Sequence, residues 1–440
     1  MTQRVGPEQL QNLAQYSQGM DERAVDLKIS RREFLLKSLP LAGAAVGANV
    51  LAVAAGWAMH RWKVPRLFSS LWPADNPYVR EARWWRVACA GVQCTLCPFQ
   101  CFLPEGQRGI CRVRLNQGGR LVTLVWGHPV SVHVDPIEKK PVFHLLPGSP
   151  IYSLAAVGCS LRCSFCQNWA ISQTFPEEAE NTTLVPYDLG LFSASGGRVM
   201  ARLEQKEIAF LSPQDIVAFA KKTFCRSIAY TYSEPIVFYE YVYASARLAK
   251  EAGLKNVMVS CGYINPEPLA EAAPYFDVIK IDLKGFNENF YRKIVGGQLK
   301  FVLQTLVELK KRGVFTEIVN LVVPALNDDL GEIRLMCRWV KENLGRDVPL
   351  FFSRFHPDYR LENLPATPVE TLDKARQTAL AEGLHYVYIG NTPGHPGENT
   401  YCPTCGNVLI RRYGYAVLEN KIGSSGLCPY DGTRIPGIWS

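Results

Sequence analysis

The sequence predicts an α/β protein built as a partial parallel β/α barrel, with a small cysteine-rich metal-binding domain on its N-terminal and C-terminal sides. Two observations lead to this prediction. From about residue 149, short apolar runs alternate with amphipathic segments, which indicates parallel strands with helices outside them. All of the 14 cysteines except Cys225, Cys261 and Cys337 fall into three groups, one inside this region and one on each side of it.

The composition is that of a folded protein. A length of 440 residues allows two or three domains. A hydrophobic content of 48% with 20% charged residues indicates a substantial core and excludes a disordered chain. The net charge of +8, from 48 basic and 40 acidic residues, is mild and gives no specific nucleic-acid signal.

The N-terminal region carries a targeting pattern after a tail at residues 1–29. The stretch "SRREFLLK" (30–37) precedes an uncharged run at 38–59. Paired arginines before such a run resemble a twin-arginine export signal. As a helix the run would be about 33 Å long, enough to cross a bilayer. We therefore predict a signal or membrane anchor at 30–59, the alternative being a buried Ala-rich helix, and a linker at 60–85.

The first cysteine group lies in a predicted small domain at residues 86–148. Its spacing is C-x2-C-x3-C-x9-C, and four such ligands close a tetrahedral site. A disulfide framework is the alternative, but a chain of this length buries a core without such bridges. We predict zinc or an iron–sulfur cluster at this group, with Cys89 left over; the ligands are Cys94, Cys97, Cys101 and Cys111.

The predicted barrel occupies residues 149–395. Its expected strands begin at residues 151, 227, 256, 277, 316, 349 and 385. Its expected helices span 213–223, 238–252, 299–312, 332–343 and 369–382. Six or seven strand–helix repeats without a second sheet pattern favour a barrel, in which chemistry lies at the C-terminal ends of the strands. Residues 174–210 interrupt the alternation and are predicted to form an insertion near the site.

The central group follows the first of these strands in the stretch "VGCSLRCSFCQNW". Cys159, Cys163 and Cys166 are spaced C-x3-C-x2-C. Four cysteines saturate a [4Fe–4S] cluster, whereas three leave one iron open. An open coordination position is where a reactant binds. The motif thus favours a catalytic cluster, with a zinc site completed by a remote ligand as the alternative.

This motif resembles that of the radical S-adenosylmethionine (radical SAM) superfamily, in which an aromatic residue, here Phe165, precedes the last cysteine. The resemblance implies a barrel of radical SAM type and a [4Fe–4S] cluster that binds SAM through its amino and carboxylate groups. It further implies reductive cleavage of SAM to a 5′-deoxyadenosyl radical, which takes hydrogen from a substrate. An electron donor such as ferredoxin or flavodoxin is then required.

The resemblance extends to the ends of later strands. Ser233 and Glu234, in "YTYSEP", occupy the place of the family's Gly-Gly-Glu-type motif, where a carboxylate accepts hydrogen bonds from the SAM ammonium. Ser260 begins "SCGYI", where relatives often have Asn-Gly; Cys261 departs from that pattern. By itself, a Ser-Glu-Pro stretch is equally typical of a helix N-terminus.

Two further positions are assigned to the SAM site by resemblance to glycyl-radical activating enzymes. Asp282 and Lys284 form their D-x-K motif, with a surface ion pair as the alternative. His356, in "SRFHPDY", follows a later strand where activases have a histidine near the SAM ribose; a structural histidine is the alternative.

The last cysteine group defines a predicted rubredoxin-like or zinc-ribbon-like domain at residues 396–440. Its pattern is C-x2-C followed by C-x2-D, so an aspartate replaces the fourth cysteine. Aspartate ligates zinc but is unusual in structural sites. We predict zinc or iron here, or else a degraded site; the four positions are Cys402, Cys405, Cys428 and Asp431.

From Arg86 to Trp439 the chain most resembles the radical SAM enzymes of the AmmeMemoRadiSam system, relatives of the pyruvate formate-lyase activating enzyme. The motifs are "CTLCPFQCFLPEGQRGICRVR", "DPIEKKPVFHLLPGS", "GCSLRCSFCQNWAISQ" and "YCPTCGNVLIRRYGY". This implies an unknown substrate handled with Memo-type and AMMECR1-type partners. A partner protein that receives a glycyl radical is one alternative, and a membrane-tethered iron–sulfur electron-transfer protein without SAM turnover is another.

The targeting pattern and the chemistry point to different compartments. Twin-arginine export suits proteins that fold around clusters, yet SAM and low-potential reductants are cytosolic. We predict membrane association through residues 38–59 with the catalytic domain facing the cytoplasm, and export with a separate reductant supply stays open.

Overall fold

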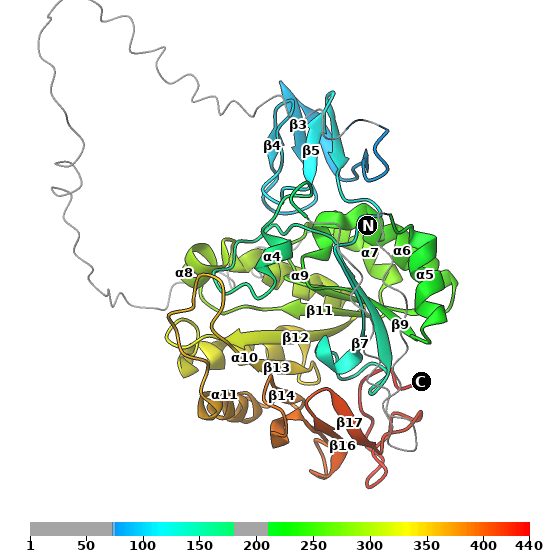
Figure 1. The fold of residues 1–440 in the computed structure, drawn as a ribbon. Helices are drawn as coiled ribbons and strands as arrows, with labels where there is room; N and C mark the ends of the chain where they lie inside the picture. The colour runs from blue at the N-terminus through cyan, green and yellow to red at the C-terminus, as the bar shows by residue number, and fades with distance from the viewer. Residues whose placement is uncertain (1–72, 74, 180–209) are drawn as a thin grey trace, which may run out of the picture. The chain divides into compact units, whose positions relative to one another are not determined.

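The computed structural model describes residue 73, residues 75–179 and residues 210–440 (Figure 1). The predicted signal or anchor at 30–59 and most of the predicted insertion at 174–210 lie outside these residues. Within the described part, no helix is long and apolar enough to span a membrane.

The central element is an eight-stranded sheet with the order β14-β13-β12-β11-β10-β9-β8-β7. Strands β8 to β14 are parallel, and β7 pairs antiparallel with β8. The strands are β7 (Ser131–Pro136), β8 (Pro150–Ala155), β9 (Ser227–Tyr230), β10 (Lys255–Ser260), β11 (Val278–Asp282), β12 (Phe315–Val322), β13 (Leu350–Arg354) and β14 (Val387–Gly390). All seven strands that the alternation predicts are present.

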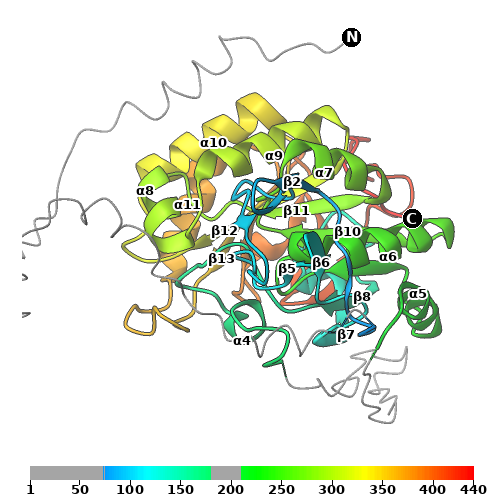
Figure 2. The same cartoon turned by 90° about the horizontal axis from the view of Figure 1, so that it is seen from above.

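Neighbouring strands in this sheet are also neighbours in the sequence, so every crossover runs in the same direction. A repeated right-handed crossover places all helices on one side of the sheet and curls it toward a barrel. Figure 2 shows the helices following one another around the sheet, from α5 and α6 at one end to α10 and α11 at the other. The fold is thus a partial α/β barrel.

The helices begin and end where the local sequence dictates. Ser212 caps α5 in a capping box with Asp215, and Pro213 occupies the first turn. Asp329 caps α10 by accepting from the Glu332 N–H. The helices are α4 (Trp169–Ser172), α5 (Pro213–Lys222), α6 (Tyr239–Glu251), α7 (Pro266–Ala272), α8 (Glu288–Phe290), α9 (Leu299–Lys311), α10 (Leu330–Leu344) and α11 (Val369–Ala381).

Short 3-10 and π-helical turns complete the connections. They are η1 (Ile137–Lys139), η2 (Pro235–Phe238), η3 (Ala273–Tyr275), η4 (Tyr291–Val295) and η5 (Pro396–Glu398).

The N-terminal cysteine-rich module consists of two small antiparallel sheets, β1-β6-β5 and β2-β3-β4. Their strands are β1 (Arg80–Glu81), β2 (Trp85–Ala88), β3 (Gly91–Cys94), β4 (Phe102–Leu103), β5 (Arg114–Gln117) and β6 (Arg120–Thr123). Strand β7, which lies in the sequence range predicted for this domain, belongs instead to the central sheet. Its antiparallel pairing explains why strand–helix alternation does not reveal it.

The C-terminal module is a three-stranded sheet of β15 (Thr400–Tyr401), β16 (Val408–Tyr413) and β17 (Ala416–Asn420). Its apolar residues, including Leu409 and Ile410, share one buried cluster with Phe351 of β13 and Tyr388 of β14. Figure 1 shows this module in orange and red beside β14. The module is therefore packed on the last strands of the barrel.

Candidate functional site

A cavity of about 770 Å³ lies at the C-terminal ends of the parallel strands. It is lined by the loops after β8, β9, β10, β11 and β13, and also by residues of the η1 region and the β16–β17 turn. The ten positions predicted for the cluster and SAM all line it: Cys159, Cys163, Phe165, Cys166, Ser233, Glu234, Ser260, Asp282, Lys284 and His356.

The three central cysteines lie on the loop after β8, directly beyond Gly158. This glycine has φ +100°, and a Cβ on it would lie 2.7 Å from the Cys111 carbonyl oxygen of the N-terminal module. Glycine is required on both counts. The Cys159 Sγ accepts from the Leu161 N–H at 3.3 Å, and the Cys166 Sγ lies 3.1 Å from the Ser172 Oγ.

The surroundings of these thiols fit a cationic cluster. Burial raises the pKa of Cys163 to about 12, although Lys284 acts to lower it. Burial also raises the pKa of Cys159 well above its ordinary value. A buried thiolate is therefore costly unless a metal neutralises it, and thiolates are the ligands of iron–sulfur clusters. Three thiols on one cavity wall fit such a cluster with one iron open to the cavity.

Glu234 lies at the end of β9 with its carboxylate facing the loop after β10. One oxygen accepts from the Ser260 hydroxyl at 2.7 Å, and the other accepts from the Cys261 N–H at 2.8 Å. Burial raises the pKa of Glu234, and these hydrogen bonds act to lower it. A carboxylate offers about four acceptor positions. The Ile236 N–H also donates, at 3.2 Å, to the oxygen that Ser260 contacts, so at least three of these positions are filled within the protein.

Cys261, which departs from the family pattern, contributes through its backbone amide. That amide donates to Glu234, while the thiol is buried. The next residue, Gly262, has φ +69° and donates its N–H to the Ser260 Oγ at 3.0 Å. Ser260 is therefore a positioning residue for Glu234.

Asp282 at the end of β11 lies between two lysines. Lys280 donates to one carboxylate oxygen, and Lys284 donates to the other at 3.1 Å. Burial alone would raise the pKa of Asp282, but the two ammonium groups lower it to about 2. The D-x-K motif is thus an ion pair on the cavity wall rather than on the outer surface, and Asp282 stays ionised.

The other predicted residues differ in their surroundings. Phe165 is buried and stacks on Phe290 with ring centroids 6.0 Å apart. The Ser233 hydroxyl donates to the Ala156 carbonyl at 2.6 Å. His356 is exposed, and its Nδ1 lies 3.2 Å from the Pro357 carbonyl oxygen. His356 therefore lines the cavity without contacting the Glu234 or Asp282 networks in the described hydrogen bonds.

A second charged group on the cavity wall escaped the sequence analysis. Lys140 is buried, pairs with Asp135 at 2.5 Å and lies 4.2 Å above the Tyr232 ring. The Tyr232 hydroxyl donates to the same carboxylate. The stretch "DPIEKKPVFHLLPGS" contains this group as an acidic residue followed by two lysines. These residues precede β8 in the sequence, and the pairing of β7 with β8 brings them to the site.

The four cysteines of the N-terminal module surround a small cavity that Arg114 also lines. The Arg114 guanidinium donates to the Cys94 Sγ at 3.4 Å and pairs with Glu240 of α6. Both partners of this pair are buried. Burial raises the pKa of Cys111 to about 11, with Cys94 raising it further. The group therefore has thiol ligands beside one fixed cation.

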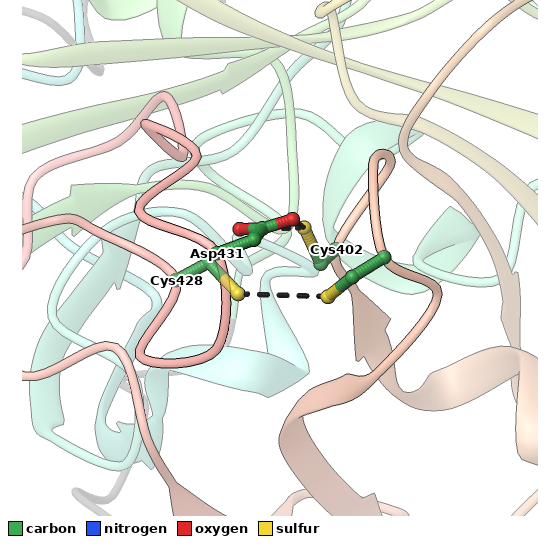
Figure 3. Close-up of side chains that lie close together, drawn as sticks. Cys402, Cys428 and Asp431 are labelled. Atoms are coloured by element: carbon green, nitrogen blue, oxygen red, sulfur yellow. Dashed lines mark hydrogen bonds between the residues drawn. The ribbon is translucent and has the colours of Figure 1, made fainter.

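The C-terminal group is more compact. In the part of the chain that the structure describes, it is the one set of cysteine, histidine and acidic side chains whose ligand atoms all lie within 4.8 Å of one another. Its members are Cys402, Cys405, Cys428 and Asp431 (Figure 3). The sequence prediction named the same four residues.

Comparison with known proteins shows to which family the part of the chain around this site is similar. Residues 154–337 match the family model described as the radical SAM superfamily. The chain is 45% identical over 322 residues to the uncharacterized protein MJ0808 of Methanocaldococcus jannaschii, covering 73% of this chain and 88% of that protein. The region that the family model matches contains the three central cysteines, and also Glu234 with its partners Ser260 and Cys261.

Two solved structures are among those similar to this chain. A domain of a pyruvate-formate lyase-activating enzyme from Bacteroides vulgatus is 15% identical with a TM-score of 0.34, covering 38% of this chain and 99% of that domain. A radical SAM methyltransferase from Sphaerobacter thermophilus is 13% identical with a TM-score of 0.38, covering 56% of this chain and 70% of that one.

Proposed function

Because the chain belongs to the radical SAM superfamily of enzymes, we propose that its barrel cavity binds a [4Fe–4S] cluster and SAM and abstracts hydrogen from a substrate. The observation that supports this most directly is the shared cavity, in which the three central cysteines, Glu234 and the Asp282–Lys284 pair face one space. When bound through Cys159, Cys163 and Cys166, such a cluster would supply the electron that splits the sulfonium C–S bond of SAM into methionine and the 5′-deoxyadenosyl radical.

In this proposal the protein holds and orients the reactants. Cys159, Cys163 and Cys166 hold the cluster. Glu234 accepts from the SAM ammonium, because the Ser260 and Cys261 donors fix its carboxylate on the cavity wall and a hydrogen bond between charged groups is strong. Phe165, Ser233, Asp282, Lys284 and His356 shape the SAM side of the cavity.

We propose that the substrate is a small molecule or a single residue, handled with Memo-type and AMMECR1-type partners. Support comes from the cavity walls: Tyr415 of the C-terminal module and Lys140 of the η1 region line the same space as the cysteines. The wall that the C-terminal module contributes would narrow the access that a large folded partner needs. A solvent-excluding cavity also protects a radical from unwanted hydrogen donors.

A glycyl-radical activase is the competing proposal, favoured by the D-x-K motif on the cavity wall. The two are separated by following the hydrogen. Deuterium from a labelled small molecule would enter 5′-deoxyadenosine in the first case, and deuterium from backbone glycine of a partner protein would enter it in the second.

The first experiment is anaerobic purification and iron–sulfur reconstitution, followed by incubation with SAM and dithionite. We expect 5′-deoxyadenosine from the wild type and none from Cys163→Ser, while Cys89→Ser, at an exposed cysteine that is not among the predicted ligands, serves as the matched control. An electron-transfer protein without SAM turnover would yield no 5′-deoxyadenosine. A cubane spectrum that does not respond to added SAM would contradict the proposal.

We further propose that residues 30–59 tether the enzyme to the membrane with the barrel in the cytoplasm, where SAM and ferredoxin or flavodoxin are found. The supporting observation is the run of uncharged residues after paired arginines. Cell fractionation with a C-terminal reporter tests this, and a periplasmic signal would contradict it.

A further inference from the structure

We propose that the C-terminal module binds a single zinc ion through four side chains: Cys402, Cys405, Cys428 and Asp431. Figure 3 labels three of them, Cys402, Cys428 and Asp431, and shows their side chains pointing toward one another from two separate loops. The Cys405 and Cys428 sulfurs are 3.7 Å apart, and the Cys402 sulfur lies 3.4 Å and 3.7 Å from the two Asp431 oxygens. All four ligand atoms lie within 4.8 Å of one another.

The two loops that supply these ligands have the same structure. Their sequences are "CPTCGN" (402–407) and "CPYDGT" (428–433). In the first, the Cys402 N–H donates to the Asn407 carbonyl at 2.9 Å and the Gly406 N–H donates to the Cys402 carbonyl at 3.0 Å. In the second, Cys428 donates to Thr433 at 2.8 Å and Gly432 donates to Cys428 at 2.9 Å.

The glycines and the second ligands match as well. Gly406 and Gly432 have φ +74° and +76°, a conformation that favours glycine. After each glycine, an amide group faces the second ligand. The Thr433 N–H donates to Asp431 at 2.9 Å, and the Asn407 side-chain amide donates to the Cys405 sulfur at 3.2 Å. Asp431 therefore takes the place in its loop that Cys405 takes in the other.

The spacing fits one ion. With Zn–S bonds of about 2.3 Å, the edge of a tetrahedron between two sulfurs is about 3.8 Å. With a Zn–O bond of about 2.1 Å, the edge between sulfur and oxygen is about 3.6 Å. The Cys405–Cys428 and Cys402–Asp431 distances agree with these edges. A disulfide would need about 2.0 Å between sulfurs and would leave Asp431 without a role.

Zinc fits the donor set better than iron. Three thiolates and one carboxylate suit zinc, whereas an iron centre of the rubredoxin-like kind takes four thiolates. Four protein ligands also close the coordination sphere, which is the mark of a structural site. Cys402 and Cys428 belong to the buried cluster that joins the module to Phe351 and Tyr388. The ion would thus fasten the module to the barrel.

Metal analysis of the full-length enzyme tests the proposal. Protein is produced with added Zn²⁺, reconstituted with iron and sulfide, and assayed for both metals per chain. We expect Cys405→Ala to lose about one equivalent of zinc relative to wild type, with its iron content unchanged. Cys405 is exposed, so truncating it removes a ligand without opening a core cavity. Cys89→Ser, also exposed, is the matched control and is expected to keep its zinc.

A second variant guards against a folding defect. Asp431→Cys restores the four-cysteine pattern and is expected to retain the zinc that Asp431→Ala loses. Co²⁺ in place of Zn²⁺ would report the change directly, because thiolate-to-cobalt absorption should grow with the fourth sulfur. Equal zinc in wild type and Cys405→Ala, iron in place of zinc, or a Cys405–Cys428 disulfide without zinc would each overturn the proposal.

Discussion

Glu234 is the residue whose surroundings define its proposed role most narrowly. Its carboxylate is held by Ser260 and Cys261 and faces the cavity. We expect Glu234→Gln to raise the KM for SAM about tenfold or more, because a hydrogen bond to a charged group contributes about 1.5–3 kcal/mol. Initial rates of 5′-deoxyadenosine formation measure this. Glu332→Gln, whose carboxylate accepts from Asn287 outside the cavity lining, is the control. An unchanged KM for SAM in Glu234→Gln would contradict the proposed contact between Glu234 and SAM.

Lys140 makes the stability of the fold depend on pH in the alkaline range. Burial lowers its pKa to about 8, although Asp135 acts to raise it. In the unfolded chain a lysine keeps its proton to about pH 10.4. Between these values the unfolded state binds the extra proton, so the stability of the fold rises with pH.

We expect the wild type to gain stability relative to Lys140→Met when the pH rises from about 7.5 to about 9.5, by on the order of 2 kcal/mol. Melting temperatures of both proteins at the two pH values measure the gain. Parallel shifts in the two proteins would show that Lys140 keeps its proton throughout this range.

At the residue scale, the motifs brought their residues to one place, while the roles of these residues as ligands stay predictions. The central cysteines, Glu234 and Asp282 all line the predicted space. The sequence did not predict that Lys140 lies against Tyr232, because this contact depends on the pairing of β7 with β8. Lys280 was hidden for another reason: it sits inside an apolar strand and meets Asp282 only because residues two apart share one face.

Among the elements, the N-terminal module is joined to the barrel through Arg114, which links the Cys94 sulfur to Glu240 of α6. In the described residues its thiols do not converge within 4.8 Å as the C-terminal ligands do. Wider spacing suits a multi-iron cluster rather than one zinc ion. We therefore propose a second [4Fe–4S] cluster at Cys94, Cys97, Cys101 and Cys111.

The expected result is that the Cys97→Ser/Cys101→Ser variant binds about four iron atoms per chain where the wild type binds about eight. Iron analysis and the reduced-state electron paramagnetic resonance spectrum of both proteins measure this, with Cys89→Ser as the control. Unchanged iron together with a lost zinc equivalent would assign zinc to the module instead.

The strands and helices of the barrel followed from periodicity alone, since buried parallel strands are apolar throughout and their helices are amphipathic. Helix α7 escaped because Pro266 and Pro268 obscure its short pattern. Strand β7 escaped because half of it is partly exposed and it runs antiparallel to β8. The two small sheets of the N-terminal module have strands of two to four residues, too short for any period.

For the whole molecule, the packing of the C-terminal module on the barrel has a direct consequence for solubility. A chain ending at residue 395 would expose Phe351 and Tyr388, which are now buried against Leu409 and Ile410. We expect this chain to be mostly insoluble and to bind a hydrophobic dye, because large exposed apolar patches promote association. Leu418→Ser, which alters a side chain that is 62% exposed on the same module, is expected to stay soluble. A soluble truncated monomer with the wild-type melting temperature would contradict this.

The cavity is lined by residues from widely separated parts of the chain. Tyr415, on the β16–β17 turn, shares its wall with residues of the η1 region and the loop after β8. The final segment docks beside β8 as well: the Leu146 N–H donates to the Ile438 carbonyl at 2.8 Å, two residues before the terminus. Because these separate parts meet in one wall only when the chain is folded, the shape of the cavity is a property of the tertiary structure and not of the cysteine loop alone.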